Sequence, residues 1–326
     1  MSGLASSCGI AGNKMLAHID RLRGERMPVT ADIFLTNYCN NRCRYCTYSR
    51  WGFDSGARAM SFDEFRRYAG RLRELGVEGF ILTGGGEPTL CPDFLRITEW
   101  LEGEGLHYGV NTNFNKPGVF FRPDFLKVSL DGFDEDSYQR WRGVRMYGQV
   151  VANIVAFEAW CRMHSPKTRI GVQCVARNVE DVRAFYEANR SLPVAYFSFR
   201  PLESTGGECY ASAAAQGQAR AVRTAIEELA ERDGRVYLNY KWDFVGTRPQ
   251  GCPASWAQIA VNERGEVMFC CHKPTEIVGH VMDEDILEKK RMASTDANLC
   301  DVPCRMSGPN RFMLGMEGLH VDSEFL

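Results

Sequence analysis

The chain has 326 residues, of which 44% are hydrophobic and 25% charged, so it is long enough for about two globular domains with a substantial core. Its 39 basic and 41 acidic residues give a net charge of -2, which excludes the basic surface of a typical nucleic-acid-binding protein. We find neither an apolar run of membrane-spanning length nor a secretory signal, and we therefore expect a cytoplasmic protein that contacts no membrane and no nucleic acid.

Short apolar runs alternate with segments of helical periodicity between about residues 30 and 200. The expected strands are residues 32–36, 79–83, 108–112, 125–130, 170–176 and 194–199. The expected helices are residues 61–75, 92–102, 150–163 and 179–189, and Ser61 and Glu64 have capping-box spacing at the first of them. This order predicts an α/β fold, a partial (β/α)6 barrel of parallel strands whose chemistry lies at the strand ends.

The composition changes after about residue 205. A Gly-Gly pair at 206–207 is followed by an Ala-, Glu- and Arg-rich helix over 213–232, and then by short strands, turns and cysteines. We therefore predict an N-terminal extension over 1–30, a barrel over 31–205, and a linker helix with a small C-terminal domain over 206–326.

Thirteen cysteines are many for an unexported protein, in which clustered thiols are read as metal ligands. Three of them, Cys39, Cys43 and Cys46, follow the first expected strand with C-x3-C-x2-C spacing. Three thiolates on one loop can hold three corners of a cubane iron–sulfur cluster and leave the fourth iron without a protein ligand. The alternatives are a zinc site, which usually takes four ligands in paired C-x2-C units, and three unrelated loop thiols.

With Tyr45 before the third cysteine, this loop resembles the C-x3-C-x-aromatic-C motif of the radical S-adenosylmethionine (SAM) superfamily. Gly84, Gly85, Gly86 and Glu87 follow the second strand, where that family has a GGE segment. The resemblance implies a [4Fe-4S] cluster that binds SAM, with these glycines and Glu87 near the amino group of SAM, and an external one-electron reductant of the flavodoxin or ferredoxin type. It also implies a 5′-deoxyadenosyl radical that abstracts hydrogen from a C–H bond. Read alone, the glycine segment is an ordinary strand-to-helix turn.

Polar residues at later strand ends occupy positions that contact SAM or substrate in the same family. By this resemblance the cofactor-binding candidates are Ser129, Asp131, Gln173, Asn178 and Arg200. Each of them is equally compatible with a turn or with a solvated polar residue at a strand end.

A second cysteine group lies near the C-terminus. Cys252, Cys270, Cys300 and Cys304 resemble the auxiliary-cluster extension of the superfamily, called SPASM in its longer form and twitch in its shorter form. The tail has too few cysteines for two clusters, so the resemblance implies one auxiliary [4Fe-4S] cluster with four thiolate ligands. A zinc ribbon is the alternative, although C-x2-C pairs are missing. A non-enzymatic electron carrier that uses both clusters is a further possibility.

Cys271 directly follows the predicted ligand Cys270 and should face a different side of its strand. The alternatives are that Cys271 is the cluster ligand in place of Cys270, or that Cys271 takes no part in the reaction. A free thiol beside the substrate would return a hydrogen atom and give an epimerase, whereas electron loss to the auxiliary cluster would give a dehydrogenase. The expected substrate is a sugar, cyclitol or aminoglycoside, since only about 31 residues precede the first strand and a leader-binding domain is not expected. A ribosomally made peptide is the alternative substrate.

Overall fold

Six parallel strands form the centre of the computed structural model, which describes residues 16–22, 26–48, 57–205, 210, 212–248 and 251–317. They are β1 (Thr30–Phe34), β2 (Gly79–Thr83), β3 (His107–Thr112), β4 (Phe125–Ser129), β5 (Arg169–Ala176) and β6 (Tyr196–Pro201). Each pairs in parallel with the next. The predicted partial barrel is therefore confirmed, with strand ends displaced by about two residues at most.

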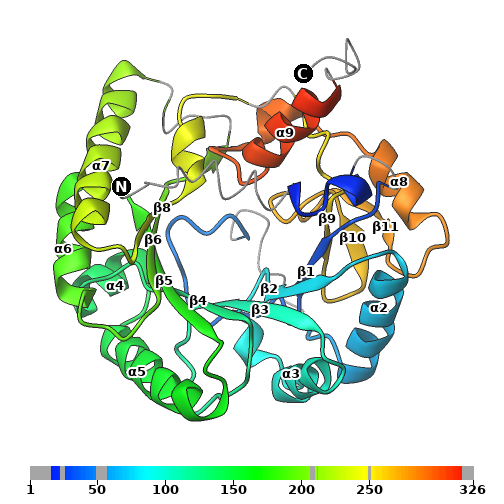
Figure 1. Ribbon diagram of the computed structural model, residues 1–326, viewed down its shortest axis with the longest axis horizontal. Helices are drawn as coiled ribbons and strands as arrows, with labels where there is room; N and C mark the ends of the chain where they lie inside the picture. Colours follow the sequence, from blue (N-terminus) through cyan, green and yellow to red (C-terminus); the bar gives the residue numbers. More distant parts are fainter. Residues whose placement is uncertain are drawn as a thin grey trace.

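Helices cover the outer face of this curved sheet (Figure 1). They are α2 (Phe62–Glu74), α3 (Phe94–Gly103), α4 (Glu135–Arg142), α5 (Tyr147–His164), α6 (Val179–Asn189) and α7 (Ala213–Arg232). The predicted capping box is present at α2, where Ser61 and Glu64 bond to each other's backbone N–H groups. Helix α4 was not predicted, because its polar sequence lacks the apolar stripe that marks a helix.

The strands alternate between two environments with the expected period of two residues. In β4, Leu126 and Val128 are fully buried under the helices, whereas Phe125, Lys127 and Ser129 are partly exposed on the inner face. Inner-face side chains of this kind line the interior of the barrel.

The C-terminal segment continues the barrel sheet. Strand β9 (Gln258–Val261) pairs in parallel with β1, and β10 (Glu266–Met268) and β11 (Ile277–His280) follow as antiparallel strands. At the other edge β8 (Val236–Leu238) pairs with β6, which makes a sheet of ten strands. The predicted domain over 206–326 thus shares one sheet with the barrel, because backbone pairing across the predicted boundary could not be read from local sequence.

Short elements complete the described part of the chain. They are η3 (Pro88–Leu90), β7 (Ser204–Thr205), η5 (Tyr240–Phe244), α8 (Ile286–Met292), η6 (Ala297–Leu299), β12 (Asp301–Val302) and α9 (Ser307–Glu317). The Gly-Gly pair at 206–207 and the first half of the predicted N-terminal extension lie outside the described residues. Every helix within the described ranges is too short or too polar to span a bilayer.

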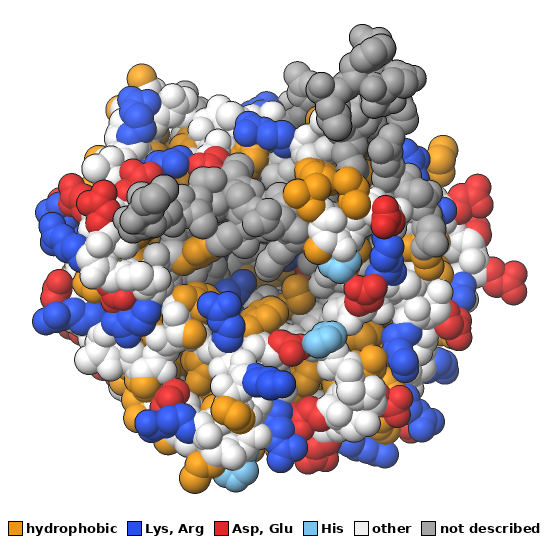
Figure 2. Space-filling view, viewed as in Figure 1, with side chains coloured by type: hydrophobic (Ala, Val, Ile, Leu, Met, Phe, Trp, Pro, Cys, Tyr) orange, Lys and Arg blue, Asp and Glu red, His pale blue; other side chains and the backbone are white. Residues whose placement is uncertain are grey.

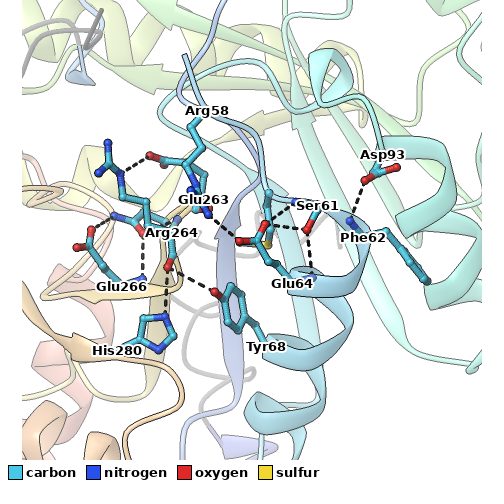
Figure 3. A network of polar contacts seen from close by, with 12 residues as sticks. Arg58, Ser61, Phe62, Glu64, Tyr68, Asp93, Glu263, Arg264, Glu266 and His280 are labelled. Carbon is cyan, nitrogen blue, oxygen red and sulfur yellow. Dashed lines mark hydrogen bonds and ion pairs between the residues drawn. The ribbon is translucent and has the colours of Figure 1, made fainter. Parts of the chain in front are cut away.

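Polar contacts attach the β9–β10 hairpin to the start of the barrel (Figure 3). The Arg58 guanidinium donates to the carbonyl of Glu263 at 3.2 Å, and the Tyr68 hydroxyl donates to the carbonyl of Arg264 at 3.5 Å. Gly265 closes the turn at φ +81°, and a Cβ there would lie 2.6 Å from the Tyr68 ring. The hairpin that leads to the second cysteine group is therefore held in a defined position on the barrel.

Candidate active site

The C-terminus of α4 holds the loop that carries Cys39, Cys43 and Cys46. Backbone N–H groups of Arg42 and Arg44 donate to the carbonyls of Arg142 and Trp141, at 3.0 and 3.1 Å. These carbonyls are free at a helix end, and the loop supplies their missing donors. The unpredicted helix α4 thus positions the cysteine motif.

The three thiols lie within electrostatic range of one another beside a buried arginine. Burial raises the pKa of Cys39 to about 11 and also raises the pKa of Cys43. The positive charge of the Arg142 guanidinium lowers the pKa of both thiols. Within the described residues, no three Cys, His, Asp or Glu side chains converge on a single-ion site. A cubane cluster is larger than one ion and takes its thiolates at separate corners, so this donor set suits an iron–sulfur cluster.

The glycine segment after β2 packs directly against the cysteine loop. The N–H of Gly86 donates to the carbonyl of Thr36 at 2.9 Å, and the N–H of Glu87 donates to the carbonyl of Tyr38 at 2.8 Å. A Cβ on Gly86 would lie 2.0 Å from the Tyr38 carbonyl oxygen, and one on Gly84 would lie 3.3 Å from that of Thr36. The absence of a side chain at Gly86 therefore makes room for the backbone of the cysteine loop. From the sequence we had expected the glycines to make room for SAM.

We expect Gly86→Ala to lower the unfolding free energy by about 1–3 kcal/mol, because its methyl group cannot fit without moving backbone. It should also reduce the iron retained after reconstitution, since the displaced segment supports the cysteine loop. Gly85→Ala is the matched control, because its Cβ would lie 3.8 Å from Phe34 in ordinary contact. Denaturant unfolding and iron analysis check this, and equal stability of the two variants would contradict it.

The Glu87 carboxylate is buried and accepts hydrogen bonds from protein donors. It accepts hydrogen bonds from the hydroxyls of Thr112 and Thr89, at 2.5 and 2.8 Å, and from the N–H of Asn113 at 2.7 Å. A carboxylate that is 3% exposed needs such partners to offset its lost hydration. Protein donors thus reach both carboxylate oxygens, and the predicted contact of Glu87 with the amino group of SAM stays a prediction.

Asp131 and Asn178 also bind protein groups. The Asp131 carboxylate pairs with Arg142 at 3.2 Å and accepts from the N–H of Val175 at 2.6 Å, so it fixes the arginine beside the cysteine loop. The Asn178 side chain accepts from the N–H of Asp181 at 2.7 Å and caps α6. Both side chains therefore have protein partners that only the folded chain reveals, and their contact with SAM or substrate stays a prediction.

A cavity of about 810 Å³ runs through the interior of the barrel. Cys43, Tyr45 and Cys46 line one part of it, and the inner-face residues Ser129, Gln173 and Arg200 line the wall. Four of the predicted cofactor-binding residues therefore meet here: Tyr45, Ser129, Gln173 and Arg200. Two buried polar atoms on this wall, the Tyr45 hydroxyl and the Asn111 Oδ1, have no hydrogen-bond partner among the described residues. Such atoms fit a site for a polar ligand.

The predicted auxiliary ligands are brought together by the C-terminal segment. Burial raises the pKa of Cys252 to about 12 and the pKa of Cys270 and Cys304 to about 11. Cys300 further raises the pKa of Cys252 and of Cys304, and Cys252 raises the pKa of Cys270. The four thiols therefore lie within electrostatic range of one another. Four clustered thiols are the donor set of a saturated [4Fe-4S] cluster.

Lys290 lies beside these cysteines and was missed from the sequence. It is 0% exposed, and its ammonium donates to the carbonyls of Met268, at 3.1 Å, and Phe269. Its thiol neighbours raise its pKa while burial, the larger effect, lowers it to about 8. The run Glu288–Arg291 is strongly charged and is typical of a solvated helix face, so local sequence contained no signal for a buried lysine.

Cys271 faces the cavity, away from the cysteine group. It packs against Phe34 and Met268, and its carbonyl accepts from the Tyr48 hydroxyl at 2.9 Å. We predicted the two neighbouring thiols to diverge through strand alternation, but β10 ends at Met268. A turn, in which the N–H of Lys273 donates to the carbonyl of Cys270 at 3.0 Å, separates them instead.

The cavity lining also carries charged residues from three segments of the chain. Arg200 lies in β6 and Glu203 follows that strand. Lys241 lies in η5, and His272 and Arg305 come from the C-terminal segment. The sequence analysis named Arg200 as a candidate and missed Lys241 and Arg305, which lie in segments without a motif. The cavity therefore joins the cysteine loop to the C-terminal segment in one space.

Comparison with known proteins identifies the class that this fold and cysteine loop define. Residues 33–157 match the model of the Radical SAM superfamily. The half-barrel is also the fold of Streptococcus suis SuiB bound to precursor peptide SuiA, with a TM-score of 0.57 and 14% identity over 86% of this chain and 69% of that one. The structure of native anSMEcpe with bound AdoMet has a TM-score of 0.57 and 15% identity, over 83% of this chain and 82% of that one. Residues 33–157 of this chain thus belong to the Radical SAM superfamily.

Curated relatives match over a part of the chain of similar length. The GTP 3′,8-cyclase of Mannheimia succiniciproducens is 34% identical over 140 residues, which are 38% of this chain and 40% of that protein. The probable GTP 3′,8-cyclase of Pyrococcus horikoshii is 32% identical over 134 residues, 39% of this chain and 42% of that protein. The matched region spans about two fifths of the length of these relatives. The first cysteine loop and the glycine segment lie within residues 33–157, which match the family model. Membership of the family implies a [4Fe-4S] cluster and SAM.

Proposed function

We propose that this chain is a radical SAM enzyme that inverts a carbon centre of a polar substrate held in the barrel cavity. When bound, the cluster and SAM supply a 5′-deoxyadenosyl radical, which removes a hydrogen atom from a C–H bond. The observation that carries the proposal is that Cys43 and Cys46 line the same cavity as Cys271. Hydrogen removal and hydrogen return can then occur on two sides of one substrate.

The residues fit these cofactors in two groups. Cys39, Cys43 and Cys46 would hold the first cluster, with the Arg142 guanidinium offsetting the negative charge of their thiolates. Tyr45, Ser129, Gln173 and Arg200 would bind polar groups of SAM, together with backbone of Gly84, Gly85 and Gly86. In this proposal Glu87 and Asp131 act through their neighbours, since the first supports the glycine segment and the second fixes Arg142.

Cys271 would be the hydrogen donor. Its side chain is 5% exposed, and burial raises its pKa well above the usual range, which keeps the thiol protonated. Donating a hydrogen atom to the substrate radical gives the epimer and leaves a thiyl radical on Cys271. One electron and one proton would restore the thiol, and the external flavodoxin- or ferredoxin-type reductant would supply the electron. Cys252, Cys270, Cys300 and Cys304 would hold an auxiliary cluster that could carry it.

Dehydrogenation is the competing outcome at the same site. The substrate radical would then lose an electron to the auxiliary cluster and a proton to solvent, which gives a carbonyl and a product lighter by two hydrogens. The proximity of Cys271 to Cys270 and Cys304 is compatible with both routes. The cavity-facing thiol favours epimerisation, because a dehydrogenase needs no such donor.

Peptides are the second class of substrate that an observation favours. SuiB bound to precursor peptide SuiA and anSMEcpe bound to the Cp18Cys peptide share the fold of this chain. Sugars and cyclitols remain candidates because hydrogen-bonding side chains, such as Asn111, Gln173 and Asn239, line the cavity. A screen of cyclitols, amino sugars and short peptides for stimulated 5′-deoxyadenosine formation would separate these classes.

We expect turnover of the substrate so identified in D2O to place one deuterium at the inverted carbon. Cys271→Ala should still form 5′-deoxyadenosine and consume the substrate hydrogen, but should deliver no epimer. Cys174→Ala is the matched control, because that thiol is equally buried but does not line the cavity. Mass spectrometry and NMR of the product check this. An unlabelled product two mass units lighter, formed equally by Cys271→Ala, would establish dehydrogenation instead.

A further inference from the structure

The loop between Cys39 and Cys43 contains a buried asparagine amide. Asn41 is 2% exposed, and its backbone N–H donates to the Cys39 sulfur at 3.4 Å. The Nδ2 atom of its side chain is buried and has no hydrogen-bond partner among the described residues. Burying an N–H group without an acceptor costs free energy, so this amide needs an acceptor that the folded chain alone does not provide.

Hydrogen bonds from the segment after β3 fix which end of the Asn41 amide carries Nδ2. The backbone N–H of Asn115 donates to Oδ1 of Asn113 at 3.0 Å, so the other end of the Asn113 amide is its donor, Nδ2. That Nδ2 atom donates to Oδ1 of Asn41 at 3.2 Å, and the Asn115 amide donates to the same oxygen at 2.5 Å. Because Oδ1 of Asn41 accepts both of these bonds, its Nδ2 atom is the end left for another acceptor.

This remaining end faces the cysteine loop. Burial is the main effect on the pKa of Cys43 and raises it, whereas the Asn41 side chain, as a hydrogen-bond donor, lowers it. The same amide acts in this way on the Tyr138 hydroxyl, whose pKa is raised mainly by burial. An amide nitrogen carries two N–H bonds, so Asn41 can serve both the sulfur and the tyrosine oxygen.

The nearby charges leave room for a neutral donor of this kind. Arg142 acts against burial on the pKa of Cys43, but Asp131 pairs with the guanidinium at 3.2 Å and offsets its charge. Over the face seen in Figure 2, described side chains of both charge signs are interspersed, so this surface imposes no field of one sign on the loop. Hydrogen bonds to the sulfurs are therefore an important local control on a cluster held there.

We propose that the Asn41 amide donates to the Cys43 sulfur of the first cluster and thereby raises the reduction potential of that cluster. Reduction adds negative charge to the cluster and its thiolates, so an N–H donor stabilises the reduced form more than the oxidised form. A cluster that is easier to reduce accepts the electron for SAM cleavage more readily. The inference rests on the part of the proposed function that places the first cluster on Cys39, Cys43 and Cys46, and it is independent of the substrate.

The experiment is an anaerobic redox titration of the reconstituted full chain without SAM, monitored by electron paramagnetic resonance. The first cluster is identified as the one whose signal changes when SAM is added to a parallel sample. Asn41→Leu has a similar volume but no N–H group, and we expect it to lower the ratio of reduced to oxidised first cluster about tenfold at a given solution potential. For a one-electron couple this is a shift of about 59 mV to lower potential.

Asn153→Leu is the matched control. Asn153 is also buried, but its Nδ2 atom donates to the carbonyl of Phe114 at 2.7 Å, so its loss should leave the potential of the cluster unchanged. Asn41→Asp is the second variant, because it keeps an oxygen for Asn113 and Asn115 and replaces the N–H2 group by another oxygen. It should hold the loop in place and also lower the potential.

A first-cluster potential at or above the wild-type value in either Asn41 variant would overturn the inference. An equal shift in Asn153→Leu would do the same, because lost packing would then be the cause. Loss of the cluster from both Asn41 variants would assign Asn41 a purely structural role and also overturn it. A wild-type chain without a SAM-responsive signal would contradict the first cluster as well, whereas the expected shifts without 5′-deoxyadenosine formation would contradict the proposed enzyme alone.

Discussion

Replacing Cys39, Cys43 and Cys46 together by alanine should remove about half of roughly eight irons per reconstituted chain and all reductive cleavage of SAM. The physical reason is that these thiols share one loop held by the carbonyls of Trp141 and Arg142, so no other described cysteine can replace them there. Iron analysis, electron paramagnetic resonance and chromatography of 5′-deoxyadenosine measure the result.

The matched control for this variant replaces Cys161 and Cys174, which are buried in the hydrophobic core, by alanine. That variant should keep its full iron content and its SAM cleavage, because neither thiol belongs to a cysteine group. Retained SAM cleavage in the triple variant would contradict the assignment of the first cluster and, with it, the proposed function.

Replacing Cys252, Cys270, Cys300 and Cys304 by alanine should remove the other half of the iron and loosen the C-terminal segment. This segment has a small core of its own, in which Ala254, Trp256 and Met306 pack next to Cys252 and Cys304. Cluster binding would therefore be coupled to its ordering. We expect faster proteolysis within residues 251–317, a lower Tm and loss of turnover.

The barrel should survive this second change, because β1 to β6 pair with one another independently of those cysteines. Circular dichroism should therefore change little while proteolysis accelerates. The first triple variant is the natural comparison, since it should lose the opposite half of the iron and keep the C-terminal segment intact. A quadruple variant that keeps all its iron, or full activity, would show that the ligand set is different.

Local sequence was sufficient for the architecture and for the first cysteine loop. The six barrel strands follow from apolar runs bounded by turn residues, and α2 follows from its capping box and apolar stripe. The motif of Cys39, Cys43 and Cys46 with the glycine segment was enough to reach the Radical SAM superfamily. These features depend on neighbours within about ten residues, and periodicity and spacing report such short-range relations directly.

The chemistry of the cavity was decided by the tertiary structure. Glu87 and Asp131 resemble ligand-binding carboxylates in the sequence, but folding brings Thr112, Asn113 and Arg142 against them and satisfies them internally. The pairing of β9 with β1 likewise joins segments more than 200 residues apart. A buried charge takes whichever partner the fold brings to it, and that partner is remote in sequence. The pairing of Glu203 with Arg200 and Lys241 therefore becomes visible only when β6 and η5 meet around one cavity.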